Sequence, residues 1–130
     1  MLKKLDHIGI VVENIQEARL PFEALGLQVS NSQDVPGKPV TVACVPLGDS
    51  EIELLQPNTG DSNIARFLTD HGEGLHHICF EVDNLEASMQ VMGQAGIKFI
   101  DKAPRQGVSG RIIFLDASTC NGILIELVEK

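Results

Sequence analysis

Short apolar runs alternate with helix-like segments along the chain, and this alternation occurs twice. Residues 5–12 are rich in Ile and Val, which is typical of a β-strand. A helix is predicted next, with Asn14 as its N-cap and Gly26 just beyond its end. Pro21 lies inside that span and is expected to kink or shorten the helix, because proline has no amide hydrogen. The apolar face of this helix would consist of Ile15, Ala18, Phe22 and Leu25.

Three further strands are predicted after the helix, and the last two are joined by a turn. The segment Leu47-Gly48-Asp49-Ser50 has the composition of a tight hairpin turn. The second half repeats the order, with a strand at 75–82 and a helix at 85–95 that ends at Gly96. The remaining strands are predicted at 28–30, 40–46 and 51–56 in the first half, and at 97–100, 111–115 and 122–128 in the second.

The sequence itself also repeats. The segment 6–10, which contains His7, returns as 76–80, which contains His77, at an offset of 70 residues. Each half then ends in a similar string, in which Glu53 and Glu126 occupy matching places. Each copy therefore supplies one histidine and one glutamate, as a pseudo-symmetric site for a divalent metal would require.

The predicted fold class is α+β, with two tandem βαβββ modules. Module one would cover about residues 1–57, a linker helix would lie within 58–74, and module two would cover about 75–130. A chain of 130 residues fits one domain, so both modules are expected to share a single fold. Four-stranded modules tend to curl, and two placed edge to edge would form a half-open mixed β-sheet barrel around the metal site.

Alternation along the strands selects the side chains that share a face. His77 has the parity that matches His7, whereas His76 points the other way, and Gln56 has the opposite parity from Glu53. A single histidine or glutamate on a strand is more often a hydrogen-bonding or solvated residue. Four of them in register favour a metal site instead, and mixed imidazole and carboxylate ligands suit Co, Ni, Zn, Mn or Fe(II).

The charge and composition of the chain argue against several classes of partner. The net charge of −8 and the lack of Trp and Tyr disfavour nucleic acid and anionic membranes. The apolar runs are too short to span a bilayer and no signal peptide is recognisable, so a cytoplasmic protein is expected. Three widely spaced cysteines indicate reduced thiols. The basic residues Lys102, Arg105 and Arg111 are candidates for pairing with an anionic small molecule, or are ordinary surface charges.

These motifs resemble those of the vicinal oxygen chelate superfamily, which includes glyoxalase I, extradiol dioxygenases and resistance proteins. The finer resemblance is to its methylmalonyl-CoA epimerase family, and it covers residues 5–128. It rests on the strings Leu5 to Ile10, Ile52 to Pro57, Asp61 to Leu68, Gly72 to Ile78 and Gly122 to Leu127.

The resemblance implies a metal-dependent epimerase that interconverts (R)- and (S)-methylmalonyl-CoA. The implied metal ligands are His7, Glu53, His77 and Glu126, with Glu126 as one catalytic base and Glu53 as a candidate for the second. Co²⁺ is the first choice of metal, with Zn²⁺, Ni²⁺ or Mn²⁺ as alternatives. The implied partners are an acyl-CoA substrate and a second copy of the chain in a homodimer. A glyoxalase I-type lactoylglutathione lyase, or a metal-free binding or resistance protein of the same fold, remain alternatives.

Overall fold

The structure, a computed structural model, describes residues 1–130 and contains eight β-strands and three α-helices. The chain divides into two compact units, one formed by His7–His76 and the other by Met1–Asp6 together with His77–Lys130. We call them the continuous and the discontinuous unit. Strand β1 (Leu2–Val11) contributes its first half to the discontinuous unit and its second half to the continuous one. None of the helices has the length and apolar character needed to cross a membrane.

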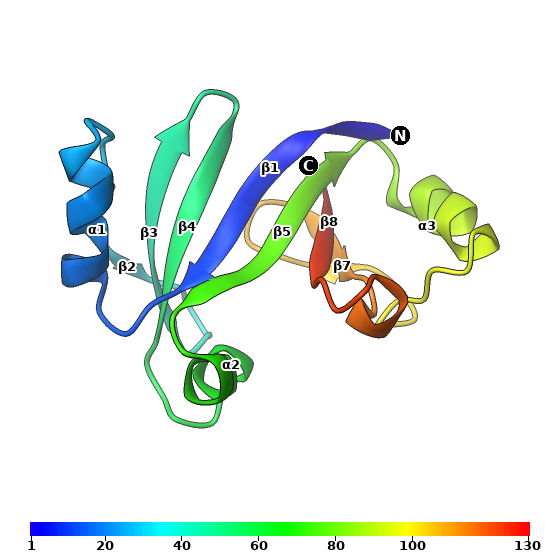
Figure 1. The fold of residues 1–130 in the computed structure, drawn as a ribbon. Helices are drawn as coiled ribbons and strands as arrows, with labels where there is room; N and C mark the ends of the chain where they lie inside the picture. The colour runs from blue at the N-terminus through cyan, green and yellow to red at the C-terminus, as the bar shows by residue number, and fades with distance from the viewer. The chain divides into compact units, whose positions relative to one another are not determined.

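The continuous unit has the predicted βαβββ order, and its strands follow the order β2-β3-β4-β1 (Figure 1). β4 pairs in parallel with β1 and antiparallel with β3, and β3 pairs antiparallel with β2. Leu47 pairs with Ser50, so the predicted hairpin turn is confirmed, and Gly48 adopts a φ of 61° there. The elements are α1 (Ile15–Ala24), β2 (Gln33–Asp34), β3 (Val40–Leu47), β4 (Ser50–Pro57) and α2 (Asn63–His71).

Helix α1 packs on one face of these strands. The Asn14 side chain accepts a hydrogen bond from the Glu17 amide at the predicted N-cap. Pro21 is accommodated inside the helix, which ends at Ala24. The predicted inward position of Leu25 is wrong, because this residue is the C-cap and its side chain is 77% exposed. The core beneath the helix consists of Val12, Ile15, Ala43, Val45 and Leu54, with Ala18 and Phe22 packed against it.

The discontinuous unit repeats the same arrangement. β8 pairs in parallel with β5 and antiparallel with β7, which pairs antiparallel with β6. Helix α3 covers one face, over a core that includes Val82, Leu85, Ile113, Leu115 and Leu127. A smaller cluster of Cys79, Ile112 and Val128 lies on the other face of the strands. The elements are β5 (Gly74–Val82), α3 (Leu85–Gln94), β6 (Arg105–Gln106), β7 (Arg111–Phe114), a 3₁₀ turn (Ala117–Thr119) and β8 (Ile125–Glu129).

The strands predicted at 28–30 and 97–100 are wrong. Residues 28–30 are held beside β3 at one point only, where Ser30 exchanges hydrogen bonds with Cys44 through its amide and its hydroxyl. Residues 97–100 form a single bridge between Phe99 and Leu115. The remaining strands of each module are instead the two-residue strands β2 and β6. The α+β class and the repeated βαβββ order are nevertheless confirmed.

Candidate metal site

In the continuous unit the structure brings His7 and Glu53 together. The parallel register of β1 and β4 sets Gly9 opposite Glu53, so His7 lies two residues before that position and on the same face. The His7 Nε2 and Glu53 Oε1 atoms are 3.5 Å apart. The neighbouring Leu54 points to the opposite face, into the core beneath α1. The strand packing therefore fixes which side of the sheet carries the polar pair.

In the discontinuous unit His77 and Glu126 form an equivalent pair. Cys79 lies opposite Glu126 in the parallel register of β5 and β8, and His77 again precedes that position by two residues. The His77 Nε2 and Glu126 Oε1 atoms are 3.4 Å apart. The ring of Phe114 meets the His77 ring edge-on, with centroids 6.1 Å apart. Both members of this pair are about nine-tenths buried, with side-chain exposures of 9% and 10%.

The Nε2–Oε1 distances within the two His–Glu pairs fit binding of both atoms to one metal ion better than a direct hydrogen bond. A usual N–H···O hydrogen bond spans about 2.7–3.2 Å, shorter than the 3.4 and 3.5 Å observed. Two donors each about 2.1 Å from one metal ion would be about 3.0–3.4 Å apart in octahedral or tetrahedral geometry. Imidazole nitrogen and carboxylate oxygen are also a chemically suitable donor set for a first-row divalent ion. Each unit therefore carries one pair of side chains that fits a divalent metal.

The thiol of Cys44 and the carboxylate of Glu51 lie beside Glu53. Cys44 pairs directly with Glu53 across β3 and β4, and ligand atoms of Cys44, Glu51 and Glu53 lie within 4.8 Å of one another. Burial, together with the carboxylates of Glu51 and Glu53, raises the pKa of the Cys44 thiol to about 12. The thiol is therefore neutral at physiological pH, which disfavours Cys44 as a nucleophile.

Other residues singled out in the sequence have structural contacts. His76 packs edge-on against Phe67 of α2, with ring centroids 5.0 Å apart. Gln56 accepts a hydrogen bond from the Ile15 amide through its side-chain oxygen.

Arg111 forms ion pairs with Glu86 and Glu129, so it serves the fold. Arg105 lies 5.9 Å from the centre of the Phe114 ring. Phe114 was not among the predicted site residues. It lies opposite Glu126 in the β7–β8 pairing and is therefore a neighbour of the His77–Glu126 pair.

Comparison with known proteins places this chain in a family. A family model described as the glyoxalase/bleomycin resistance protein/dioxygenase superfamily matches residues 6–114. An uncharacterised protein of Bacillus subtilis is 39% identical over 130 residues, which cover 98% of this chain and 93% of that protein. Mitochondrial methylmalonyl-CoA epimerase of Homo sapiens is 37% identical over 129 residues, which cover 97% of this chain and 73% of that protein.

Solved structures of related proteins support the same family assignment. A methylmalonyl-CoA epimerase in complex with methylmalonyl-CoA and NH4⁺ superimposes with a TM-score of 0.85 at 30% identity, covering 100% of this chain and 96% of that one. A variant of the Streptomyces coelicolor epimerase in complex with 2-nitronate-propionyl-CoA has the same TM-score and identity, covering 100% and 99%. The chain therefore belongs to the glyoxalase/bleomycin resistance protein/dioxygenase superfamily and, within it, to the group that contains the methylmalonyl-CoA epimerases.

Proposed function

We propose that this protein is a metal-dependent epimerase of methylmalonyl-CoA, with His7, Glu53, His77 and Glu126 as ligands of one divalent ion. The observation that carries the proposal is that each unit holds a His–Glu pair in the same strand register, with nearly equal donor separations of 3.5 and 3.4 Å. The duplication of the sequence supports one site that draws a pair from each unit. Co²⁺ is the expected ion, with Zn²⁺, Ni²⁺ or Mn²⁺ as alternatives.

The reaction needs a proton to leave and return at the carbon between a thioester and a carboxylate. A divalent ion held by these side chains would stabilise the negative charge that develops on the substrate oxygens as the proton leaves. Glu126 accepts the proton and the C–H electron pair delocalises into an enolate. Inversion then requires a proton delivered to the opposite face, and we assign this step to the Glu53 carboxyl, which gives up a proton while Glu126 keeps the one it removed. Exchange with solvent then returns both groups to their starting states. The Glu53 side chain is more exposed than that of Glu126, at 24% against 10%, which suits proton exchange with substrate and solvent.

Family membership supports the class of reaction and the class of substrate. The enzyme is an isomerase, and the acyl-CoA molecules bound in the related structures support a CoA thioester as its substrate. We expect a homodimer in the cytoplasm. Light scattering on the purified protein would test whether it is a homodimer.

The decisive experiment follows hydrogen–deuterium exchange at C2 of methylmalonyl-CoA in D₂O. We expect rapid exchange with added Co²⁺ and loss of exchange after treatment with EDTA, with parallel measurement of bound metal. His76→Ala is a matched control, because His76 has the opposite strand parity from His77 and packs against Phe67. Turnover of methylglyoxal with glutathione, without exchange on methylmalonyl-CoA, would favour the glyoxalase I-type alternative. Protein that binds no divalent metal would favour the metal-free binding alternative.

A further inference from the structure

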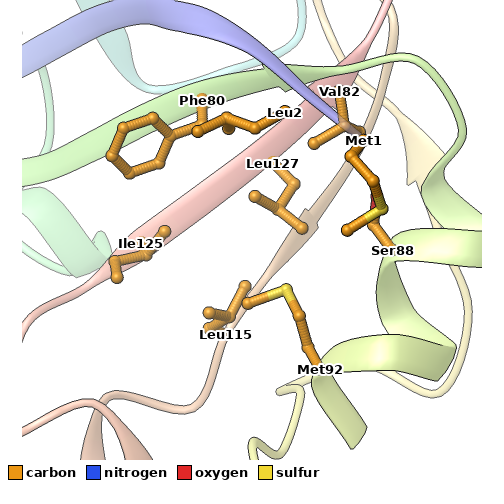
Figure 2. A pocket seen from close by; sticks show the side chains of 9 residues that line it. All are labelled: Met1, Leu2, Phe80, Val82, Ser88, Met92, Leu115, Ile125 and Leu127. Atoms are coloured by element: carbon orange, nitrogen blue, oxygen red, sulfur yellow. The ribbon is translucent and has the colours of Figure 1, made fainter.

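A cavity of about 260 Å³ lies in the discontinuous unit, between helix α3 and the strands it covers (Figure 2). Phe80, Ile125 and Leu127 line it from β5 and β8, and Ser88 and Met92 line it from α3. On β5 and β8 these lining residues have the opposite parity from His77 and Glu126. The cavity therefore lies on the other face of the strands from the proposed metal ligands.

One polar atom in this cavity has no partner. Ser88 is only 2% exposed, and its hydroxyl oxygen is buried without a hydrogen bond to any group of the chain. Most buried hydroxyl groups in proteins are hydrogen-bonded, because leaving one unpaired after it loses contact with water is unfavourable. The other lining side chains are apolar, so they offer no second group to hold a water molecule at Ser88.

We propose that this cavity binds a small, neutral, mainly apolar molecule that carries one hydrogen-bonding group, such as a primary alcohol or a phenol. The apolar walls would cover the hydrocarbon part, and the Ser88 hydroxyl would donate to or accept from the polar group. An apolar cavity of about 150 Å³ in another protein takes up benzene, so the present one has room for about six to eight carbon atoms. No charged side chain lines the cavity, and the ammonium group of the lining residue Met1 is already paired with Asp83, so a carboxylate would be buried without an ion-pair partner of its own.

The flexible side chains at the cavity support entry of such a ligand. Met92 lines the wall, and Met1 lines the cavity while remaining 55% exposed. Methionine side chains adapt readily to ligands of different shape. Met89 of the same helix packs in the core and does not line the cavity. The three methionines of the chain therefore provide two reporters and one internal control.

The test is an NMR titration of protein labelled with ¹³C in the methionine methyl groups. We expect 1-hexanol to shift the Met1 and Met92 methyl resonances saturably, with little change at Met89, and hexanoate at pH 7 to cause no saturable shift. Absence of a saturable shift with 1-hexanol would overturn the proposal, as would equal binding of hexanoate. Shifts that depend on protein concentration and not on 1-hexanol would show that a second copy of the chain occupies the cavity instead.

The variant Ser88→Ala isolates the contribution of the hydroxyl. Alanine is a good helix former, so helix α3 should persist, which circular dichroism would confirm. We expect the dissociation constant for 1-hexanol to rise about 3- to 10-fold, as loss of one hydrogen bond implies, while that for benzene changes little. Gln90→Ala, at an exposed position of the same helix, should leave both constants unchanged. Equal 1-hexanol affinity in Ser88→Ala and the wild type would overturn the assigned role of Ser88.

Discussion

The two His–Glu pairs share a strand register but differ in their surroundings. The His77–Glu126 pair is about nine-tenths buried, and Phe114 packs against its imidazole. In the His7–Glu53 pair the carboxylate is 24% exposed and lies beside the neutral thiol of Cys44. Each half thus carries the same His–Glu pair, while the neighbouring residues differ. The difference gives the two carboxylates unequal environments, which suits the separate roles proposed for them.

The largest effect is expected from removing a ligand of the more buried pair. His77→Ala and Glu126→Ala should lower metal-supported exchange at C2 by more than about 100-fold, because each removes a proposed direct ligand. Replacing even a residue that only hydrogen-bonds to a metal ligand costs about 10- to 100-fold. Bound metal, measured by mass spectrometry, should fall in parallel. His76→Ala should lose much less activity, and a reversal of this order would contradict the assignment from strand parity.

Removing the titratable group of Glu53 should separate the roles of the two carboxylates. Glu53→Gln keeps a side-chain oxygen as a possible metal ligand but removes the proposed proton donor, so interconversion of the epimers should fall by about 100-fold, within the usual range for a general acid or base. Exchange at C2 starting from one pure epimer should persist, because the proposed base Glu126 would still remove and return a proton on its own face. Chiral analysis of each deuterated product distinguishes these outcomes. Equal loss of exchange from both epimers would show that Glu53 acts on both faces or serves only as a ligand.

The two units are alike at the N-termini of α1 and α3. Asn14 and Asn84 accept hydrogen bonds from the Glu17 and Ala87 amides, respectively, so both helices begin with the same cap. Asn14→Ala and Asn84→Ala should each reduce the free energy of unfolding by about 1 kcal/mol. Urea denaturation would measure both. Clearly unequal losses would show that the units do not depend equally on their helices.

Each of these two helices also has a contact with a strand, α1 with β4 and α3 with β8, and the two contacts differ in charge. The Ile15 amide donates to the neutral side chain of Gln56, at 2.9 Å, whereas the Leu85 amide donates to the charged side chain of Glu129, also at 2.9 Å. Glu129 is in addition bound by Arg111, with a shortest separation of 2.7 Å. Only the contact in the discontinuous unit can therefore titrate with pH.

The smallest expected effect follows from this difference. Hydrogen bonds from Arg111 lower the pKa values of the Glu86 and Glu129 carboxyl groups in the folded protein. Their stabilisation is therefore complete above the ordinary pKa of glutamate and is lost as the pH falls through the lowered values. Arg111→Met should destabilise the protein at pH 7, and the difference from wild type should shrink towards pH 3. These side chains are partly exposed, so the effect should be smaller than that of a cap.

Gln56→Ala provides the matched control in the continuous unit. It removes the contact with the Ile15 amide, but the amide side chain of Gln56 does not titrate. The destabilisation by Gln56→Ala should therefore vary little between pH 7 and pH 3. Urea denaturation at both pH values would measure both variants, and similar pH dependence in the two would contradict the role given to Arg111.

The sequence is sufficient to predict what depends on strand parity and helix capping. The closeness of His7 to Glu53 and of His77 to Glu126 follows from alternation along paired strands. The strand predicted at 28–30 fails because the hydroxyl of Ser30 takes part in a local contact with Cys44 in place of a continued ladder. The two-residue strand β2 is too short to show an alternating pattern. The cavity at Ser88 depends on how side chains of distant segments pack, which no local pattern encodes.

The division of strand β1 between the units has a consequence for synthesis on the ribosome. The continuous unit uses residues 7–76 without interruption, so all of its chain is available once that stretch has emerged. The discontinuous unit combines Met1–Asp6 with residues up to the C-terminus, and its Met1 carbonyl accepts a hydrogen bond from the Asp83 amide. Residues Met1–Asp6 must therefore remain without these partners until residues 77–130 have been made. We expect the nascent chain to expose this half-strand until those residues have emerged.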